Sequence, residues 1–195
     1  MLTCWKAMTA ERRNHQVVML GLEGAGKTTL LYRLKMPLWK PREIVRDMEK
    51  NRRSDGKDWD PGYHYEELNI GRLKHHGVWD VPGSEAMINM WPTFYRYISV
   101  VAVLFVVDGS NAGAKDEAKL AKARNLLHFL LNEDELRVSA FVLVINERVG
   151  PQYPEERSNM QQIAHALGVH EIMEQDWNKS RFHMVNLNCA EVSTH

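Results

Sequence analysis

Short apolar stretches alternate with longer amphipathic stretches along most of this 195-residue chain. The stretches 100–107 and 138–145 are almost continuously apolar and rich in valine, which is typical of strands buried on both faces of a sheet. Two further stretches flank a turn at Gly71 and predict a hairpin. The pattern as a whole predicts strands at 16–21, 63–69, 72–80, 100–107, 138–145 and 182–187.

The amphipathic stretches predict helices between these strands. Pro92 interrupts one of them and predicts a kink or break, because proline cannot donate the backbone hydrogen bond of a helix interior. Another carries apolar residues at helical spacing, with charged residues on the opposite side: Leu120, Ala123, Leu127 and Leu131. Helices are therefore expected at 27–35, 85–97, 115–131 and 155–167, the last closed by Gly168 as a C-cap.

Strands that alternate with helices at this spacing predict a doubly wound α/β sheet. Right-handed crossovers then bring the loops after the strands to one edge, where a ligand binds. Residues 38–60 depart from this regularity because charged residues dominate them. They form either a solvated loop or short exposed helix, or an insert that docks a partner. The sequence ends at His195, just after its last predicted strand. The helix that normally follows this strand and covers the adjacent face of the sheet is therefore either lost by truncation or replaced by another cover.

Composition narrows the class of protein. Lys+Arg and Asp+Glu both number 25, and a net charge of zero gives no indication of a nucleic-acid partner or of an anionic membrane. The two cysteines, Cys4 and Cys189, predict neither a disulfide framework nor a zinc site, which favours a reducing, cytoplasmic compartment. The longest apolar run, 100–107, is too short to span a bilayer.

Residues 1–14 are expected to form a flexible segment ahead of one domain at 15–195. The segment lacks the apolar core and the cleavage site of a secretory signal, and Leu2 in the second position excludes N-myristoylation. One alternative is that Leu2, Trp5 and Met8 form a very short apolar face that lies on a membrane or docks in a groove. The other alternative is plain disorder.

The stretch GLEGAGKTT, residues 21–29, matches the pattern G-x-x-x-x-G-K-[ST] between a predicted strand and a predicted helix. Its glycines allow the backbone to wrap closely around phosphate oxygens, and the amides at the start of the helix favour an anion. Lys27 neutralises terminal phosphates, and the Thr28 hydroxyl can ligate Mg²⁺. The stretch therefore predicts a site for the phosphates of a nucleotide.

Asp80 ends the stretch HHGVWD and precedes a turn. In a phosphate-loop fold this aspartate lies beside the loop and holds Mg²⁺, usually through water. The alternative is a surface aspartate that starts a turn. The spacing from the phosphate loop favours the metal role, so Thr28 and Asp80 are the predicted metal ligands.

A family resemblance is carried by six stretches in order: GLEGAGKTTLLYRLK, VWDVPGSE, VLFVVDGSN, NEDELR, LGVHEI and NCAE. Together they resemble the ADP-ribosylation-factor (Arf and Arf-like) branch of the Ras-type small GTPases, over about residues 16–195. The resemblance implies a six-stranded sheet, binding of GTP or GDP with Mg²⁺, two switch segments that reorder with the γ-phosphate, and effector binding at membranes through exposed aromatic residues near the switches. With the phosphate-loop pattern, it predicts nucleotide contacts at Gly21, Glu23, Gly24, Ala25, Gly26, Lys27, Thr28, Thr29, Gly83, Asn146, Cys189 and Ala190.

The two switch segments depart from the family. In the first, Asp60 takes the place of a threonine that senses Mg²⁺ and the γ-phosphate; a carboxylate can ligate the metal but repels the γ-phosphate, and Pro61 stiffens the segment. In the second, Pro82 replaces a glycine, and Ser84 replaces the glutamine that orients the attacking water. Ser84 is too short for that task, and Glu85 is the neighbour that could substitute. No catalytic residue is therefore assigned, and hydrolysis is expected to be weak or absent.

The base-reading motif also departs from the family pattern Asn-Lys-x-Asp, whose aspartate accepts two hydrogen bonds from guanine. Asn146 is kept, but Glu147 stands at the lysine and Val149 at the aspartate. Valine accepts no hydrogen bond, so the preference for guanine is expected to fall. The last loop is kept, with the Ala190 amide at the base carbonyl and Cys189 as a small packing residue that is not a nucleophile.

The first functional hypothesis is an Arf-like GTP-binding protein with weak or absent hydrolysis, which acts as a nucleotide-dependent binding switch in membrane trafficking or related partner recruitment. Effectors or regulators would bind its switch segments and the 38–60 insert. A peripheral contact with an internal membrane is an alternative that the sequence leaves undecided. The alternative is a pseudo-GTPase scaffold with weak, non-guanine-selective or no nucleotide binding. A third hypothesis, an NTPase or kinase of altered base preference, has no other catalytic motif to support it.

Overall fold

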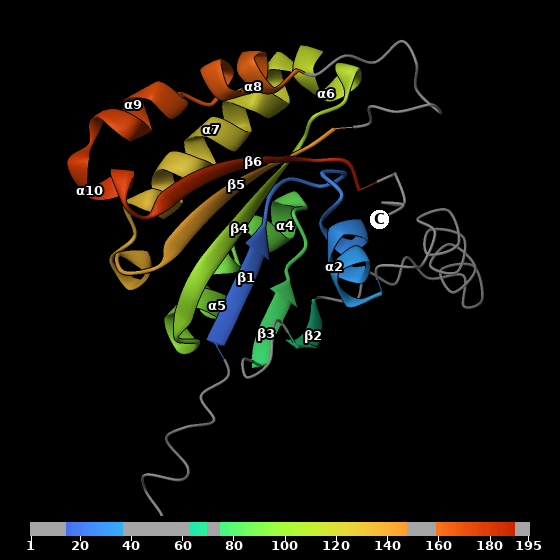
Figure 1. Ribbon diagram of the computed structural model, residues 1–195, viewed down its shortest axis with the longest axis vertical. Coiled ribbons are helices and arrows are strands. Elements are labelled where there is room, and N and C mark those ends of the chain that lie inside the picture. The colour runs from blue at the N-terminus through green and yellow to red at the C-terminus, as the bar shows by residue number, and fades with distance from the viewer. Residues whose placement is uncertain (1–14, 37–62, 70–74, 148–158, 190–195) are drawn as a thin grey trace, which may run out of the picture.

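The computed structural model describes residues 15–36, 63–69, 75–147 and 159–189. Figure 1 shows a six-stranded sheet in the order β2-β3-β1-β4-β5-β6, with helices on both faces. β2 runs antiparallel to β3, and the other paired strands run parallel. The predicted doubly wound, mostly parallel sheet is therefore confirmed.

Several expectations concern residues outside the described ranges. These are the segment 1–14, the insert at 38–60 with Asp60, Val149 of the base-reading motif, and Ala190 of the last loop. The expectations about them remain predictions.

The strands follow the apolar stretches of the sequence closely. Val103, Phe105 and Leu143 have no exposed surface, as expected of central parallel strands covered on both faces. The described strands are β1 (His15–Leu20), β2 (His64–Asn69), β3 (His75–Asp80), β4 (Val100–Asp108), β5 (Ala140–Asn146) and β6 (Phe182–Leu187).

Two of the predicted helices differ in the structure from their expected bounds. The break expected near Pro92 separates α4 from α5, and Pro92 lies in the first turn of α5, where its missing amide costs no helical hydrogen bond. The helix expected at 115–131 begins at Glu117, because the Asp116 side chain accepts from the Lys119 amide and caps it. The described helices are α2 (Lys27–Lys35), α4 (Glu85–Ile88), α5 (Trp91–Tyr97), α6 (Asn111–Lys115), α7 (Glu117–Leu131), α8 (Met160–Ala166), α9 (Val169–Glu174) and α10 (Asp176–Lys179), with a 3-10 turn at Asp134–Leu136.

The C-terminal helices are shorter and more numerous than predicted. α8 begins at Met160, and residues 155–158 of the predicted helix lie outside the described ranges. Gly168 has a φ of 69° and ends α8 as expected, but α9 follows it directly. The sequence pattern missed α6, α9 and α10 because helices this short show too little periodicity to be recognised.

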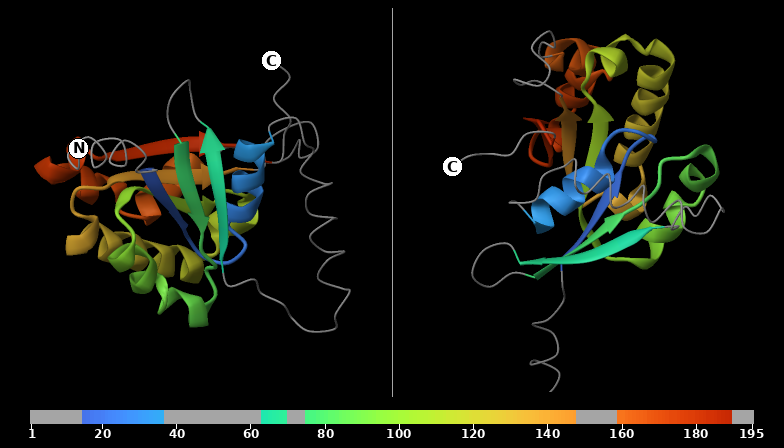
Figure 2. Two further views of the ribbon diagram at one scale, coloured as in Figure 1. Left: turned by 90° about the horizontal axis from the view of Figure 1, so that it is seen from below. Right: turned by 90° about the vertical axis from the view of Figure 1, so that its right-hand side faces the viewer.

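The sheet separates two apolar cores, and the views in Figure 2 show helices on opposite faces of the sheet. On one face, α5, α7, α8 and α9 pack against strand residues such as Phe105. The buried residues that α7 contributes include the four predicted from their spacing: Leu120, Ala123, Leu127 and Leu131. On the other face, Leu31 of α2 packs with Met19. β1 therefore lies in the middle of the sheet, where the connections diverge and a ligand site is expected at the carboxyl end.

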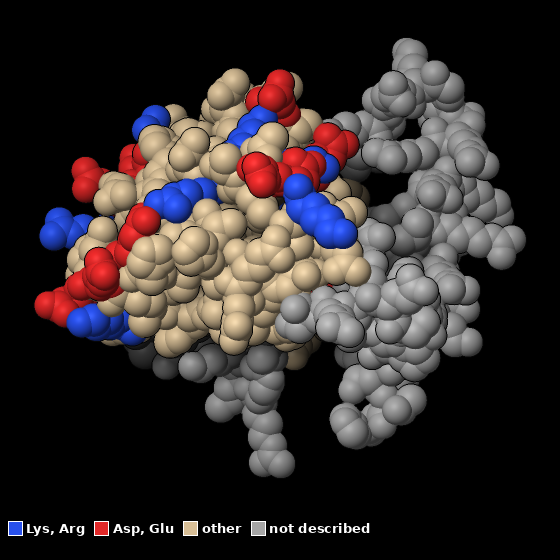
Figure 3. Space-filling model, turned by 90° about the horizontal axis from the view of Figure 1, so that it is seen from above, with Lys and Arg blue, Asp and Glu red and all other residues tan. Residues whose placement is uncertain are grey.

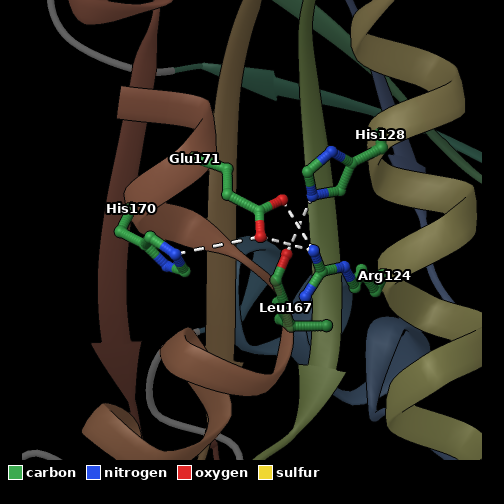
Figure 4. A network of polar contacts seen from close by, with 5 residues as sticks. All are labelled: Arg124, His128, Leu167, His170 and Glu171. Atoms are coloured by element: carbon green, nitrogen blue, oxygen red, sulfur yellow. Dashed lines mark hydrogen bonds and ion pairs between the residues drawn. The ribbon is translucent and has the colours of Figure 1, made fainter. Parts of the chain in front are cut away.

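A polar network also joins α7 to α9 (Figure 4). Nη2 of Arg124 lies 2.6 Å from both carboxylate oxygens of Glu171, and Nε2 of His128 lies 3.0 Å from the Leu167 carbonyl oxygen. His170 Nε2 lies 3.8 Å from Glu171 on the other side. The hydrogen bond from Arg124 holds the pKa of Glu171 below its ordinary value of 4.5. The helices on this face are thus linked by charge as well as by apolar packing.

The surface carries charges of both signs. On the face shown in Figure 3, basic and acidic side chains of the described residues are interspersed and form no large patch of one sign. Within the described part of the chain, no helix combines the length and the apolar character needed to cross a membrane. On this face the described residues thus show the same balance of charge as the sequence.

Candidate functional site

The loop between β1 and α2 is compact because its glycines adopt conformations that other residues rarely reach. Gly21, Gly24 and Gly26 have φ angles of 142°, 81° and 89°. A Cβ at Gly21 would lie 2.1 Å from the carbonyl oxygen of Val106, and a Cβ at Gly26 would lie 2.2 Å from Nδ2 of Asn146. The loop therefore packs against the ends of β4 and β5 with no room for side chains at these points.

Lys27 begins α2, and its side chain turns back under the loop. Its Nζ donates to the carbonyl oxygens of Gly21 at 2.9 Å and Leu22 at 3.1 Å. The side chain is buried, and such contacts offset the cost of removing an ammonium group from water. Its positive charge thus lies at the loop, beside the backbone amides at the start of α2.

Thr28 and Asp80, the predicted metal ligands, are in direct contact. Oγ1 of Thr28 donates to Oδ2 of Asp80 at 2.5 Å, and the aspartate is buried. The parallel register of β1 and β3 pairs Met19 with Asp80, which brings the carboxylate beside the loop. A hydroxyl and a carboxylate are oxygen donors of the kind that Mg²⁺ prefers. The described residues contain no cluster of three or more His, Cys, Asp or Glu suited to a metal, so a cation here would also need phosphate or water ligands.

The turn after β3 lies on the phosphate loop and is held from two sides. The amide of Glu23 donates to the Gly83 carbonyl oxygen at 3.2 Å, and a Cβ at Gly83 would lie 2.0 Å from the carbonyl oxygen of Gly21. On the other side, the indole Nε1 of buried Trp91 donates to the Pro82 carbonyl oxygen at 3.0 Å. The turn is therefore fixed between the phosphate loop and α5.

Ser84 and Glu85 follow this turn. Ser84 precedes α4 but makes no side-chain cap bond. Glu85 turns to α7, where Oε1 accepts from Nζ of Lys122 at 2.6 Å, and its side chain is 89% exposed. The contact with Lys122 lowers the pKa of Glu85. Glu85 thus makes its contact with α7 and not with the phosphate loop.

Asn146 links the phosphate loop to the last loop of the chain. Its Nδ2 donates to the Ala25 carbonyl oxygen at 3.0 Å, and its Oδ1 accepts from the Cys189 amide at 3.2 Å. Cys189 is buried, and burial raises the pKa of its thiol to about 11. The thiol therefore stays protonated near neutral pH, which agrees with the packing role predicted for it.

Glu147 is buried, although it replaces a lysine of the family pattern. Its Oε1 accepts from the backbone amide of Asn159 at 2.9 Å, and its Oε2 accepts from Nδ2 of Asn186 at 2.7 Å. The sequence marked Glu147 only as a lost nucleotide contact. It could not show these partners, because both lie far along the chain.

An aromatic cluster lies beside the turn. Tyr63 packs on Trp79 and on Phe94, with ring centroids 5.4 and 5.5 Å apart, and Tyr65 packs on Trp79 at 4.7 Å. Tyr63 is 51% exposed and Tyr65 37% exposed. The cluster therefore presents aromatic surface between the β2-β3 hairpin and α5, whereas Trp91 belongs to the core.

Most of the predicted contacts meet at one edge of the sheet. The loops after β1, β3 and β5 and the end of β6 converge there, as the bonds between them show. Thr29 lies in the first turn of α2 and is half-buried. The described residues gathered there are Gly21, Glu23, Gly24, Ala25, Gly26, Lys27, Thr28, Thr29, Asp80, Gly83, Asn146 and Cys189.

Comparison with known proteins decides the family. The model of the ADP-ribosylation factor family matches residues 1–188. The chain belongs to the ADP-ribosylation factor family. Among solved structures, it is similar to the Arl6 BBS3 small GTPase from Trypanosoma brucei with bound nucleotide analogue GppNp, at a TM-score of 0.63 and 21% identity, over 93% of this chain and 90% of that chain. That likeness shows the small-GTPase fold, and the family resemblance predicted from the sequence is confirmed.

For this Arf-family protein, the sequence analysis missed the residues that hold the motif residues in place through hydrogen bonds. Trp91, Asn159 and Asn186 all donate hydrogen bonds to residues of the predicted motifs. Trp91 is buried, and its bond to the turn is visible only in the structure. No local pattern marks such residues, because each acts on a partner that the fold brings close.

Proposed function

We propose that this Arf-family protein binds the phosphates of GTP or GDP together with Mg²⁺ and acts as a nucleotide-dependent binding protein. The observation that best supports the proposal is the contact of Thr28 with Asp80 beside the buried amine of Lys27. A phosphate-binding loop, a fixed positive charge and a pair of oxygen ligands then share one edge of the sheet. The family as a whole makes a guanine nucleotide with Mg²⁺ the expected ligand.

Each group has a definite part in binding. The Thr28 hydroxyl and the Asp80 carboxylate would hold Mg²⁺, the carboxylate directly or through water. Lys27 would turn from the carbonyl oxygens of Gly21 and Leu22 to the phosphates, because its bonds to neutral carbonyls are weaker than bonds to anionic oxygens. Bound Mg²⁺ would neutralise phosphate charge, and the amides of the loop would orient the phosphate oxygens.

Hydrolysis is proposed to be weak or absent. Ser84 stands where a glutamine would orient the attacking water, and a hydroxymethyl group is too short to do so. The neighbouring carboxylate of Glu85 is engaged by Lys122 of α7. The bond from Trp91 also holds the turn at Pro82, so the turn has little freedom to bring another side chain to the water.

Partner binding is proposed at the aromatic cluster of Tyr63, Tyr65, Trp79 and Phe94. Aromatic residues that are partly exposed supply large contact area at small cost in side-chain entropy. The cluster adjoins the turn through Trp79, which immediately precedes Asp80. A conformational change at the phosphate loop would thus be transmitted to the aromatic cluster through Asp80 and Trp79, which are adjacent in the chain. Recruitment of partners in membrane trafficking is the role we propose for it.

Identification of the bound nucleotide tests this function. The folded protein is purified without added nucleotide, any nucleotide is released and identified, and GTP, GDP and ATP are titrated with and without Mg²⁺. We expect Mg²⁺-dependent binding at micromolar nucleotide or below. No binding by the folded protein at micromolar nucleotide would overturn the proposal.

A pseudo-GTPase scaffold is the second candidate, and one observation favours it. Two donors of the phosphate loop already have partners within the protein: the Glu23 amide donates to Gly83, and Lys27 Nζ donates to Gly21 and Leu22. A ligand must replace these contacts, which lowers its net affinity. Under this alternative, partner binding at the aromatic cluster would be the same with and without nucleotide, and the titration above decides between the two.

A further inference from the structure

A buried carboxylate lies at the base side of the site. Glu147 directly follows β5, and its amide donates to the carbonyl oxygen of Leu187 at 2.7 Å, which extends the pairing with β6. Its side chain lies close to the loop after β4, because a Cβ added at Gly109 would lie 2.9 Å from Cγ of Glu147. The residue is 4% exposed. A carboxylate at such a position is costly unless donors surround it.

Two donors to this carboxylate come from separate parts of the fold. Glu147 accepts from the amide of Asn159 at the start of α8 and from the side chain of Asn186 in β6. The side chain of Asn159 donates in turn to the Gly109 carbonyl oxygen at 3.3 Å and to Oδ1 of Asn111 at 3.0 Å. Through these contacts Glu147 joins the ends of β5 and β6, the start of α8 and the loop after β4.

We propose that Glu147 is a positioning residue, whose carboxylate clamps the start of α8 to the end of β5 and is thereby withheld from the base of a nucleotide. Glu147 and Asn159 flank residues 148–158, so their bond joins the two points between which that segment runs. The family has a lysine at this position that contacts the nucleotide, whereas Glu147 contacts other residues of the protein. The statement about the nucleotide rests on the proposed function, whereas the clamp itself does not.

The donors around Glu147 decide which side chains can replace it. Asn159 offers a backbone N–H, which can only donate, so residue 147 must present an acceptor to it. Glutamine can accept there and donate its amide to Asn186, if the Asn186 amide turns to present its oxygen. Lysine has donors alone and cannot satisfy the Asn159 amide. This geometry therefore tolerates the lysine of the family pattern less well than it tolerates glutamine.

Amide hydrogen exchange at residues 159–163 tests the clamp. We expect E147Q to change the exchange rate less than about threefold, and E147K to raise it about tenfold or more, because the start of α8 opens more often without an acceptor. Wild-type protection in a folded E147K protein would overturn the clamp.

Exchange of the acceptor and donor groups between positions 147 and 186 tests the contact with Asn186. This test needs no lysine variant, so it remains decisive if E147K does not fold. N186D places two carboxylates together and should raise exchange about tenfold. In the double variant E147Q/N186D, the glutamine amide can donate to the new carboxylate and should restore protection to within about threefold of wild type. A double variant as poorly protected as N186D alone would contradict the proposal.

Nucleotide titration tests the second half of the proposal. The affinities of Mg²⁺-GTP, Mg²⁺-ATP and Mg²⁺-tripolyphosphate are measured for wild type, E147Q and E147K. We expect the GTP-to-ATP preference to change less than about threefold in either variant, since the side chain does not reach the base. A preference raised about tenfold by E147K would show that position 147 faces the base, and would overturn the proposal. If wild type binds none of the three compounds, the proposed function fails, and the exchange rates still decide the clamp.

Discussion

The Thr28 hydroxyl donates to the Asp80 carboxylate at 2.5 Å, although 52 positions separate the two residues along the chain. One residue belongs to the start of α2 and the other to the end of β3, and both strands that lead to them run parallel in the centre of the sheet. This contact turns two separate motif residues into one candidate cation site.

The first prediction concerns this pair. Asp80→Asn keeps an oxygen that accepts from Thr28 but removes the negative charge that a cation requires. We expect the fold to be retained and the Mg²⁺-dependent part of nucleotide affinity to fall about tenfold, or ~1.4 kcal/mol. Isothermal titration with and without Mg²⁺ measures it. Asp134→Asn, in the turn before β5, is the matched control and should leave the affinity unchanged; an unchanged affinity in Asp80→Asn would remove Asp80 from the cation site.

A second prediction concerns the charge under the loop. Lys27→Met retains the apolar stem but removes the ammonium group that faces the loop. We expect nucleotide affinity to fall about 100-fold, since charge-assisted bonds to phosphate are lost. Lys35→Ala changes another lysine of the same helix, which pairs with Glu66 at the surface, and should have little effect. Equal losses in the two variants would point to net charge and not to a specific contact.

A third prediction concerns hydrolysis. In single-turnover assays, the wild-type protein should cleave GTP no faster than Ser84→Gln, because glutamine can reach a water that serine cannot. Glu85→Gln should behave as wild type, since Glu85 contacts Lys122 and not the phosphate loop. A Ser84→Gln protein that is much slower than wild type would show that Ser84 is not at the position of the family glutamine.

A fourth prediction concerns the turn between Asp80 and Ser84. Trp91→Phe keeps an aromatic ring in the core but leaves the Pro82 carbonyl without its indole donor. We expect the free energy of unfolding to fall by about 1–3 kcal/mol, from the lost hydrogen bond and the smaller ring. Urea denaturation measures this. Pro82→Ala retains the carbonyl that Trp91 bonds and should cost less; a larger loss in Pro82→Ala would mean that the proline ring, and not the indole bond, stabilises the turn.

A fifth prediction concerns pH and the network in Figure 4. The pKa of Glu171 is lowered, mainly by its hydrogen bond from Arg124, so the folded state favours its ionised form. That stability is present above the unfolded value of 4.5 and is lost as the pH falls through the lower folded pKa. Glu171→Gln should therefore be less stable than wild type at neutral pH, and the difference should vanish in acid.

Denaturant unfolding of the two proteins across this pH range measures the effect. Glu174→Gln, in the same helix, is the control, because no hydrogen bond or ion pair of its side chain is described in this structure. A difference between Glu171→Gln and wild type that persists unchanged in acid would show that the contact does not depend on the charge of Glu171.

Long apolar strands and long periodic helices were predictable because their signal is local. The burial of Leu120 and Leu127 follows from helical spacing alone, and the runs that became β4 and β5 are too apolar for an exposed position. Short elements were not predictable. α6 and α9 occupy five and six residues, fewer than two turns of helix, so no period is visible in them.

The residues of the candidate site also fall into those that the sequence predicted and those that it could not predict. Lys27, Thr28 and Asp80 were predicted as site residues because phosphate binding requires particular residue types at particular spacing. Glu147 was recognised only as a departure. Its role depends on Asn159 and Asn186, which lie 12 and 39 positions away and match no motif.

The sequence by itself determined the class of fold, the phosphate-loop motif and the family, and it predicted Thr28 and Asp80 as metal ligands, because each of these is indicated by the type and order of nearby residues. The tertiary structure alone decided that Gly83 lies on the phosphate loop, that Trp91 holds Pro82, that Glu85 turns to Lys122 and that Glu147 faces the protein. These contacts join residues distant in sequence. A buried polar group takes the partner that packing places within reach, and packing is a property of the whole fold.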